Sequence, residues 1–269
     1  MGVINVTPDS FSDGGKHLSL NAALVRAAAM VEEGVAVFDV GGESTRPGAS
    51  HVSVDQELER VVPLIEALSK HFDLPISIDT QKPDVMRAAV GAGAGLINDV
   101  NGLREAGALA TVAELKVPVC LMHMQGNPRT MQADPSYLDV VGEVTNYLEG
   151  RIAACLDAGV LGSNVIVDPG FGFGKTLQHN LELLNGLARL AELGYPVLAG
   201  MSRKRMIGEI TGQNINKRLA GGLAAALLAV QNGAVLIRTH DVAETVDALK
   251  IIKAAALAVD TQVERNAQN

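Results

Sequence analysis

The sequence predicts a single α/β domain over residues 1–269, built as a (β/α)8 TIM barrel. Three observations lead to that fold class. Short apolar runs alternate with amphipathic helical segments about eight times along the chain. The apolar runs carry few polar residues, which indicates strands buried on both faces, as in a parallel sheet. The length of 269 residues is close to the usual size of one such barrel, which favours closure over an open doubly wound sheet.

Most of the expected strands end on a polar or charged residue. In chain order, the apolar runs lead to Asn5, Asp39, Asp79, Asn98-Asp99, His123, Asp168 and Arg238-Thr239-His240. The carboxyl ends of all strands in such a barrel meet at one face, and active sites are built there. The sequence therefore predicts one polar site at that face.

Helices are expected between the strands. Residues 20–33 and 54–68 carry apolar side chains at helical spacing, and Pro63 allows a kink or an early break in the second segment. Further helices are expected at 83–92, 105–115, 136–158, 177–193, 216–232 and 242–259. The polar, Gly-rich segments 5–19, 41–53 and 123–135 follow three strands, and we expect them to form substrate loops.

Composition excludes several classes of function. The formal charge is −8 and no long Lys/Arg block occurs, so we expect no nucleic-acid partner. No apolar run is long enough for a membrane span and no leader pattern is present, so we expect a cytoplasmic protein without membrane contact. Cys120 and Cys155 are expected to be buried free thiols. The motifs of acyl-enzyme and zinc hydrolases do not occur in the sequence.

Carboxylates and amides at the strand ends are the first candidates for chemistry. A lone aspartate at a strand end is more often a turn or cap residue than a catalytic one. Here Asp39, Asp79 and Asp168 share one rim with Asn5 and Asn98. Such a set can bind a metal through oxygen or hydrogen-bond a polar heterocycle, and the residues alone leave both alternatives open.

Basic residues follow the seventh and eighth strands, at 203–205 and at Arg238. Lysine and arginine at the start of a helix oppose its dipole, so a nearby anion accounts for them better than a solvated surface does. The loops after these two strands often hold phosphate in barrels of this kind. The Gly-rich segment 170–175 is only loosely similar to a phosphate loop. His123 fits a core histidine as well as a site residue.

Two long motifs and five short ones resemble the dihydropteroate synthase family. Residues 5–15 (NVTPDSFSDGG) and 39–48 (DVGGESTRPG) are similar to the first and second signatures of that family. Segments 77–80, 97–99, 168–175, 202–204 and 238–240 follow in the family's order. The resemblance extends over nearly the whole chain.

The resemblance implies a reaction of folate biosynthesis. Enzymes of this family join 6-hydroxymethyl-7,8-dihydropterin pyrophosphate to p-aminobenzoate, which gives 7,8-dihydropteroate and pyrophosphate. They are the target of sulfonamides, which mimic p-aminobenzoate. The resemblance also implies Mg²⁺ as cofactor and a homodimer.

The same resemblance assigns roles to residues of this sequence. The catalytic residues are expected to be Asp79, Asp168, Lys204, Arg238 and His240. The pterin is expected to contact Asp79, Asn98, Met122, Asp168, Lys204 and Arg238. The p-aminobenzoate pocket is expected to contain Phe11, Thr45, Arg46, Pro47, Phe173 and Ser202, and the pyrophosphate to be held by Asn5, Arg46, Arg238 and His240. Asn5 is the expected metal ligand, with Asp39 supporting Asn5 or the metal.

Three other functions agree less well with the sequence. A pterin-binding methyltransferase domain that serves a corrinoid is disfavoured by segments 45–47 and 202–204. A non-catalytic pterin-binding relative is disfavoured by the presence of Asn5, Arg46, Lys204 and His240. A phosphate-binding barrel isomerase would not require the particular residues at these strand ends.

Overall fold

A computed structural model describes residues 1–6, 16–45 and 51–267 of the protein, with the backbone alone described at 16–19 and 259–267. Within these residues, eight parallel strands form one curved sheet in chain order. They are β1 (Gly2–Asn5), β2 (Phe38–Gly41), β3 (Ile76–Asp79), β4 (Leu96–Asp99), β5 (Val119–Met122), β6 (Val165–Asp168), β7 (Val197–Ala199) and β8 (Ala234–Ile237). The predicted α/β class with eight parallel strands is therefore confirmed.

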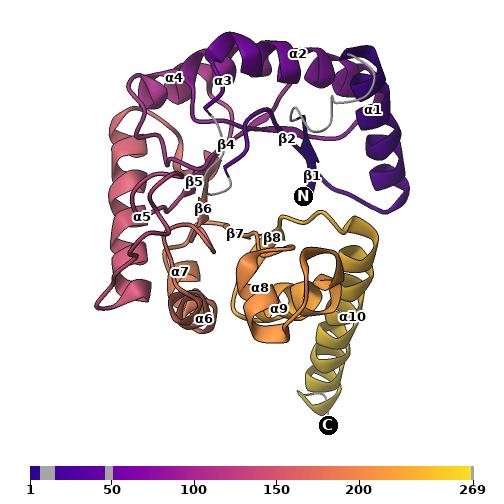
Figure 1. The fold of residues 1–269 in the computed structure, drawn as a ribbon. Coiled ribbons are helices and arrows are strands. Elements are labelled where there is room, and N and C mark those ends of the chain that lie inside the picture. Colours follow the sequence, from indigo (N-terminus) through magenta and orange to yellow (C-terminus); the bar gives the residue numbers. More distant parts are fainter. Residues whose placement is uncertain (7–15, 46–50, 268–269) are drawn as a thin grey trace.

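Helices surround the curved sheet (Figure 1). They are α1 (Lys16–Glu32), α2 (Val54–His71), α3 (Pro83–Gly91), α4 (Ala108–Leu115), α5 (Val140–Asp157), α6 (Leu177–Asn185), α7 (Leu187–Ala191), α8 (Arg205–Thr211), α9 (Leu219–Gln231) and α10 (Val242–Ala267). A chain that alternates strand and helix in this way buries both faces of a parallel sheet.

Two helical predictions need correction. Helix α2 does not break early, because it runs through Pro63 to His71. The helix expected over 177–193 is divided into α6 and α7 at Gly186, where a Cβ atom would lie 2.7 Å from Val141 of α5. The close approach of α5 thus accounts for glycine at the break. Helix α8 begins at Arg205, in the segment where the basic residues indicated the start of a helix, but its seven residues are too few for a periodic pattern that would predict its extent.

Hydrogen bonds join the beginning of the chain to the residues that follow β8. A parallel bridge pairs Gly2 with Thr239. Val3 N donates to Thr239 O at 3.0 Å, and Thr239 N donates to Met1 O at 2.9 Å. The amino group of Met1 donates to Ile237 O at 2.9 Å. These bonds tie the beginning of the chain to the end of β8, so that the strand ends face a common centre.

Side chains alternate between two faces along every strand. One set packs under the helices in the main core, as Phe38, Val40 and Ile97 do. The opposite set forms a small separate core of Met1, Leu96, Cys120 and Leu198, with Val37, Ile166 and Leu236 packed against it. Two residues further along, the same face carries Asp39, Asn98, Met122, Asp168 and Arg238. A polar layer therefore lies directly above an apolar plug.

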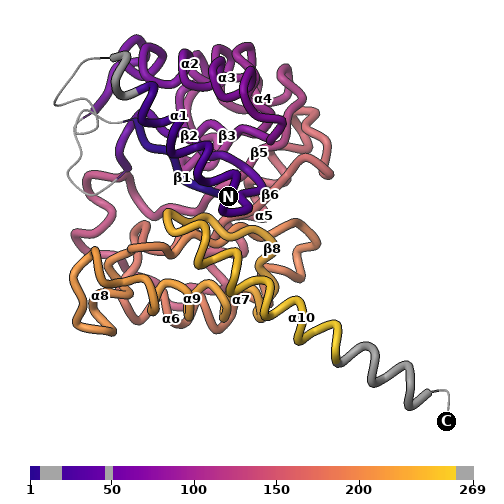
Figure 2. Tube along the Cα trace, turned by 90° about the vertical axis from the view of Figure 1, so that its right-hand side faces the viewer, coloured from indigo at the N-terminus to yellow at the C-terminus, as the bar shows by residue number. Residues whose placement is uncertain are grey.

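Helix α10 extends away from the body of the protein (Figure 2). It has 26 residues. Neither this helix nor any other in the described part of the chain combines the length and the apolar character that a membrane span requires.

Candidate active site

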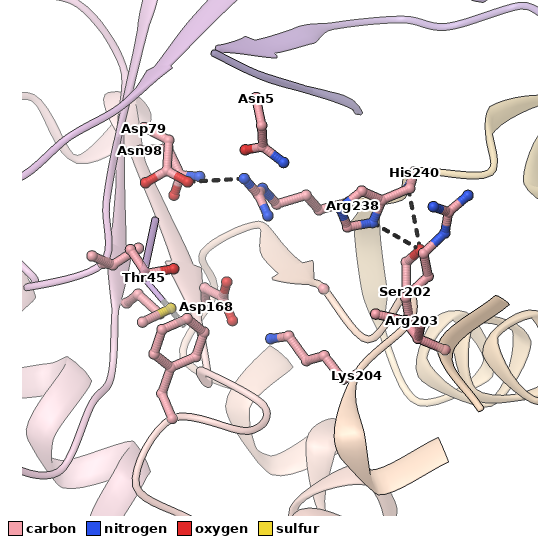
Figure 3. A pocket seen from close by; sticks show the side chains of 15 residues that line it. Asn5, Thr45, Asp79, Asn98, Asp168, Ser202, Arg203, Lys204, Arg238 and His240 are labelled. Carbon is pink, nitrogen blue, oxygen red and sulfur yellow. Dashed lines mark hydrogen bonds and ion pairs between the residues drawn. The ribbon is translucent and has the colours of Figure 1, made fainter. Parts of the chain in front are cut away.

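A cavity of about 190 Å³ opens at the carboxyl ends of the strands (Figure 3). Every described residue that was predicted to contact a substrate or the metal lines it, namely Asn5, Thr45, Asp79, Asn98, Met122, Asp168, Phe173, Ser202, Lys204, Arg238 and His240. The other three predicted residues, Phe11, Arg46 and Pro47, lie outside the described residues. The sheet thus brings together side chains that are spread over the sequence from residue 5 to residue 240.

Strand register sets the positions of the deepest lining residues. Asp79 stands opposite Asn98 in the β3–β4 pair, and Met122 stands opposite Asp168 in the β5–β6 pair. Because all the strands are parallel and alternate with period two, residues at the same height point into the same interior. The backbone ladder therefore fixes one side of the cavity.

Arg238 links two aspartates across this interior. Its Nε atom donates to Asp39 Oδ2 at 2.6 Å, and its Nη2 atom donates to Asp79 Oδ2 at 2.8 Å. Asn98 Nδ2 lies 3.4 Å from the same Asp39 oxygen. Asp39 is fully buried. The structure places it against Arg238 and Asn98, and its support of Asn5 or the metal stays a prediction.

Burial and neighbouring charges set the protonation of this cluster. Burial raises the pKa of Asp79 to about 7, against the opposing charge of Arg238, and the carboxylate of Asp39 adds to the rise. Burial alone would lower the pKa of Arg238, but Asp39 and Asp79 outweigh it and the pKa is raised. Arg238 therefore stays charged, while Asp79 can accept or donate a hydrogen bond near neutral pH.

Asp168 and Lys204 face each other across the cavity (Figure 3). Burial raises the pKa of Asp168, with Lys204 as the largest opposing charge. Burial also lowers the pKa of Lys204 to about 8, and Asp168 opposes that shift. Asp168 Oδ1 further accepts from Gly170 N at 2.7 Å, which fixes the start of the loop after β6.

Lys204 also contacts that loop. Its Nζ atom donates to Phe171 O and lies 4.8 Å from the centre of the Phe173 ring. An ammonium group over an aromatic face is attracted by the ring quadrupole. The two side chains form a wall that is flat and cationic.

A strained turn presents Ser202 and Lys204 to the cavity. Arg203, between them, has φ +60°, a left-handed conformation that is uncommon for a residue with a Cβ atom. Its guanidinium is ion-paired with Asp241, with Nε 3.3 Å from Oδ2. Ser202 Oγ lies 3.1 Å from His240 Nδ1 and 3.4 Å from Asp241 Oδ2. Asp241 therefore holds the turn in place.

A buried ion cluster anchors the segment that carries Thr45. Glu43 Oε2 accepts from Lys82 Nζ at 2.6 Å, and Glu43 Oε1 accepts from Val52 N at 3.0 Å. Lys82 also donates to the buried Glu57 of α2. The two ends of the segment 43–52 are thus tied together.

The sequence reasoning missed several lining residues. Val100, Gly200 and Ile215 line the cavity, as does Arg203, which had been noted in a motif but given no role. Val100 and Gly200 could have been found, because each comes directly after a strand end. Ile215 lies in a 3-10 turn, Ile215–Lys217, that no pattern in the sequence marks.

His123 proves to be a buried structural residue. It is 5% exposed, and its Nδ1 atom lies 2.9 Å from Lys175 Nζ. It is not among the residues that line the cavity. Burial and the charge of Lys175 lower the pKa of His123 to about 2, so it stays neutral.

The donor set for a metal is small. Among the described residues, no group of three or more His, Cys, Asp or Glu side chains gathers in a way that could hold a metal ion. Asn5 offers one neutral amide oxygen at the exposed end of β1. That donor suits an ion such as Mg²⁺, which binds one or two protein oxygens and takes its other ligands from phosphate and water.

Comparison with known proteins gives consistent matches along the chain. The model of a family described as pterin binding enzyme matches residues 1–240. A curated dihydropteroate synthase of Escherichia coli (strain K12) is 51% identical over 262 residues, which cover 97% of this chain and 93% of the relative.

Solved structures match the fold as well as the sequence. A Xanthomonas albilineans dihydropteroate synthase with 4-aminobenzoic acid is 56% identical with a TM-score of 0.90, and the match covers 95% of this chain and 92% of the other. A Yersinia pestis dihydropteroate synthase in a sulfonamide drug complex is 47% identical with a TM-score of 0.91, over 96% and 93% of the two chains. The similarity thus includes nearly all of the fold around the cavity.

Proposed function

The chain belongs to the dihydropteroate synthases of the pterin-binding enzyme family, and from that premise we propose how its residues divide the reaction. The enzyme joins 6-hydroxymethyl-7,8-dihydropterin pyrophosphate to p-aminobenzoate, a transferase step of folate biosynthesis, and sulfonamides are its inhibitors. One observation carries the assignment of roles: a single cavity has carboxylates and amides on one side and cations on the other.

The pterin ring binds to the strand-end side. Asp79, Asn98 and Asp168 offer oxygen and amide groups to the polar edge of the heterocycle, and Met122 packs against its face. The pKa of about 7 at Asp79 supports this role, because a carboxyl group near half-protonation can match either a donor or an acceptor on the ring. Met122 is almost fully buried, and the part of its side chain that lines the cavity offers an apolar surface to a flat ring.

Pyrophosphate departs on the cationic side. Arg238 and His240 bind its oxygens, with Asn5 beside them (Figure 3). The two aspartates that hold Arg238 keep its guanidinium charged and in place, so little reorganisation is needed when negative charge develops. Arg46 is the further residue proposed for this role; it lies outside the described residues.

The arylamine enters beside Phe173, Ser202 and Thr45, next to Lys204. Phe11 and Pro47 are the further residues proposed for the arylamine pocket; they lie outside the described residues. Cleavage of the C–O bond runs ahead of C–N formation in an SN1-like order, and both electrons leave with the pyrophosphate. The amine nitrogen then bonds to the pterin methylene and releases one proton. Asp168 stabilises the positive charge that develops on the methylene.

Mg²⁺ is the proposed cofactor, with Asn5 as its protein ligand. The single amide oxygen at the end of β1 supports an ion whose other ligands are pyrophosphate oxygens and water. When bound, the ion would neutralise part of the charge on the leaving pyrophosphate.

We further infer a closed (β/α)8 barrel, one domain over residues 1–269. The bridge between Gly2 and Thr239 supports closure, since it connects β1 with the segment directly after β8. Closure also agrees with the apolar plug of inward-facing side chains, because an open sheet would leave that plug uncovered.

We propose a homodimer in the cytoplasm. Large apolar side chains are exposed on the last two helices, with Leu219 and Leu228 on α9 and Ile251 and Leu257 on α10. A second copy would cover this face, as apolar surface of this extent usually marks an interface. The buried free thiols Cys120 and Cys155 support a reducing compartment. Sedimentation of the wild type and of Ile251→Asp tests the dimer.

The assay for function is pyrophosphate release from the pterin pyrophosphate with Mg²⁺, measured with and without p-aminobenzoate. We expect release that rises with p-aminobenzoate and falls when a sulfonamide is added. Binding of the pterin pyrophosphate without arylamine-dependent release would contradict the proposal and favour a non-catalytic pterin-binding protein. Normal turnover that no sulfonamide inhibits would contradict the proposed arylamine pocket alone.

A further inference from the structure

The loop after β6, residues 170–175, is held through its backbone carbonyls. Each carbonyl from 170 to 174 accepts a hydrogen bond from a side chain. The donors, in order, are Lys175 for Gly170 O, Lys204 for Phe171 O, Gln132 for Gly172 O, Lys175 again for Phe173 O, and Tyr137 for Gly174 O. The loop therefore takes its shape from side chains of other segments as well as from its own end.

The backbone of this loop needs such support. Gly170, Gly172 and Gly174 have φ values of +69°, +79° and +62°, all in the left-handed region. Glycine adopts this region easily, but it also loses the most conformational freedom when it becomes ordered. A Cβ atom at Gly170 would lie 1.9 Å from His123 O, and one at Gly174 would lie 2.6 Å from Gln125 O. The loop is pressed against the segment after β5 and cannot be stiffened by larger residues at these positions.

Lys175 makes the most bonds to the loop. Its side chain is 3% exposed, and its Nζ atom lies 2.9 Å from Gly170 O, 3.0 Å from Phe173 O and 2.9 Å from His123 Nδ1. None of these partners is a carboxylate. Burial lowers the pKa of this lysine, with Asp168 opposing the shift. In either protonation state the nitrogen keeps two N–H groups, which is the number that the two carbonyls require.

The position of the loop determines two contacts in the cavity. The Phe173 ring lies under Lys204 Nζ, and Phe171 O accepts from the same nitrogen. Lys175 does not line the 190 Å³ cavity, although it lines an adjacent hollow that shares Phe173 and Lys204 with it, and it spans the loop between Gly170 and Phe173. A change at Lys175 would reach the cavity through Phe173 and Lys204.

We propose that Lys175 is a positioning residue for the p-aminobenzoate subsite, which sets the placement of Phe173 and Lys204 by clamping the 170–175 loop. This inference rests on the proposed function. The larger effect is on the p-aminobenzoate subsite, because Phe173 belongs to that subsite, whereas the pterin contacts other than Lys204 are mostly fixed by the strands.

Lys175→Met tests the clamp, since it removes the donors and keeps most of the apolar stem. We expect the KM for p-aminobenzoate to rise about tenfold, in line with the loss of several hydrogen bonds, and the KM for pterin pyrophosphate to rise clearly less. Hydrogen exchange at the Gly172 and Phe173 amides should become faster. Equal rises in both KM values, or unchanged exchange in a folded variant, would overturn the proposal.

Two further variants keep the test decisive. Lys250→Met is the matched control, because this lysine is 70% exposed and pairs with the exposed Asp247, and it should change neither KM value. Tyr137→Phe removes one bond to Gly174 O, and we expect a smaller rise in the KM for p-aminobenzoate alone. If Lys175→Met does not fold, Tyr137→Phe decides by the same two readouts. If the wild-type protein shows no pyrophosphate release that depends on p-aminobenzoate, the proposed function is refuted. Hydrogen exchange at the amides of the 170–175 loop would still test whether Lys175 clamps the loop.

Discussion

The two sides of the cavity are built in different ways. On the proposed pterin side, Asp79, Asn98 and Asp168 are parts of strands, so hydrogen-bonded register sets their positions. On the arylamine side, Phe173 and Lys204 lie on loops that side-chain bonds hold in place. The difference teaches where substitutions outside the cavity should matter. A strand-end residue depends on the whole sheet, whereas a loop residue depends on a few contacts that one mutation can remove.

The two sides also differ in how their charges are compensated. Arg238 bridges Asp39 and Asp79 where the proposed pterin side borders the proposed pyrophosphate site, and loss of any one of the three would leave a buried charge uncompensated. Lys204, on the arylamine side, donates to a backbone carbonyl and faces an aromatic ring. Removing a charge should therefore cost more folding stability on the first side than on the second.

The largest effect is expected for Arg238→Met. Loss of one partner from a buried ion cluster typically costs about 3–5 kcal/mol of unfolding free energy. In the variant, the pKa of Asp79 rises further above its unfolded value, so the cost is greatest at high pH and declines as the carboxyl becomes protonated at low pH. Urea unfolding at pH 5 and pH 8 measures both quantities. Lys204→Met is the counterpart on the other side, and an equal loss of stability there would remove the contrast.

Asp168→Asn is expected to lower kcat by about 10²–10³-fold while the protein stays folded. The amide keeps the shape of the side chain and its bond with Gly170 N, but it carries no charge to stabilise the pterin methylene. Single-turnover assays together with thermal unfolding test this expectation. Near-normal turnover would remove Asp168 from the mechanism.

The pH dependence of kcat/KM should contain a basic limb near pH 8. The pKa of Lys204 is lowered to about 8 by burial, so the free enzyme loses this positive charge as the pH rises. Activity that needs the ammonium form should then decrease about tenfold per pH unit above that value. Lys204→Arg stays charged over this range and should lack the limb. A wild-type profile that stays flat to pH 10 would show that the charge of Lys204 is not required.

The smallest effect is expected for Phe173→Leu. The variant keeps an apolar side chain but loses the ring under Lys204 Nζ, an interaction of about 0.5–1 kcal/mol at partly exposed sites. We expect a rise of a few fold in the KM for p-aminobenzoate and no change in that for pterin pyrophosphate. Phe72→Leu is a matched control, because Phe72 packs on Phe38 outside the cavity and should affect stability alone. A change in the pterin KM with Phe173→Leu would mean that the two sides are not separable.

Strand ends were predictable, since an apolar run that delivers a polar residue is visible in the sequence itself. The positions of Asp79, Asn98 and Asp168 follow from that pattern together with parallel register. The pattern predicts where these residues lie, whereas their roles in binding and catalysis were inferred from the resemblance to the family. The break at Gly186 was not predictable, because its cause is Val141 on another helix.

Contacts between distant segments explain the other misses. The partnership of Asp39 with Arg238 joins residues 199 positions apart, and no local pattern carries it. No local pattern predicts the partners of Lys175 either. In the sequence it follows a Gly-rich segment, which suggests a phosphate-binding cation, but in the structure it bonds to His123 and to the loop itself. His123 could be assigned only when these neighbours were known.

Because the polar layer lies directly above the apolar plug on the same face of the strands, activity depends on correct strand register. A shift of one residue in β4 would turn Asn98 toward the helices and Ile97 into the cavity, because the side-chain period is two. No shifted form could retain a partly working site. After refolding from denaturant, the amount of product formed per enzyme molecule in a single turnover should thus give the fraction of molecules whose strands have assembled in the correct register. The active site therefore measures the accuracy of folding.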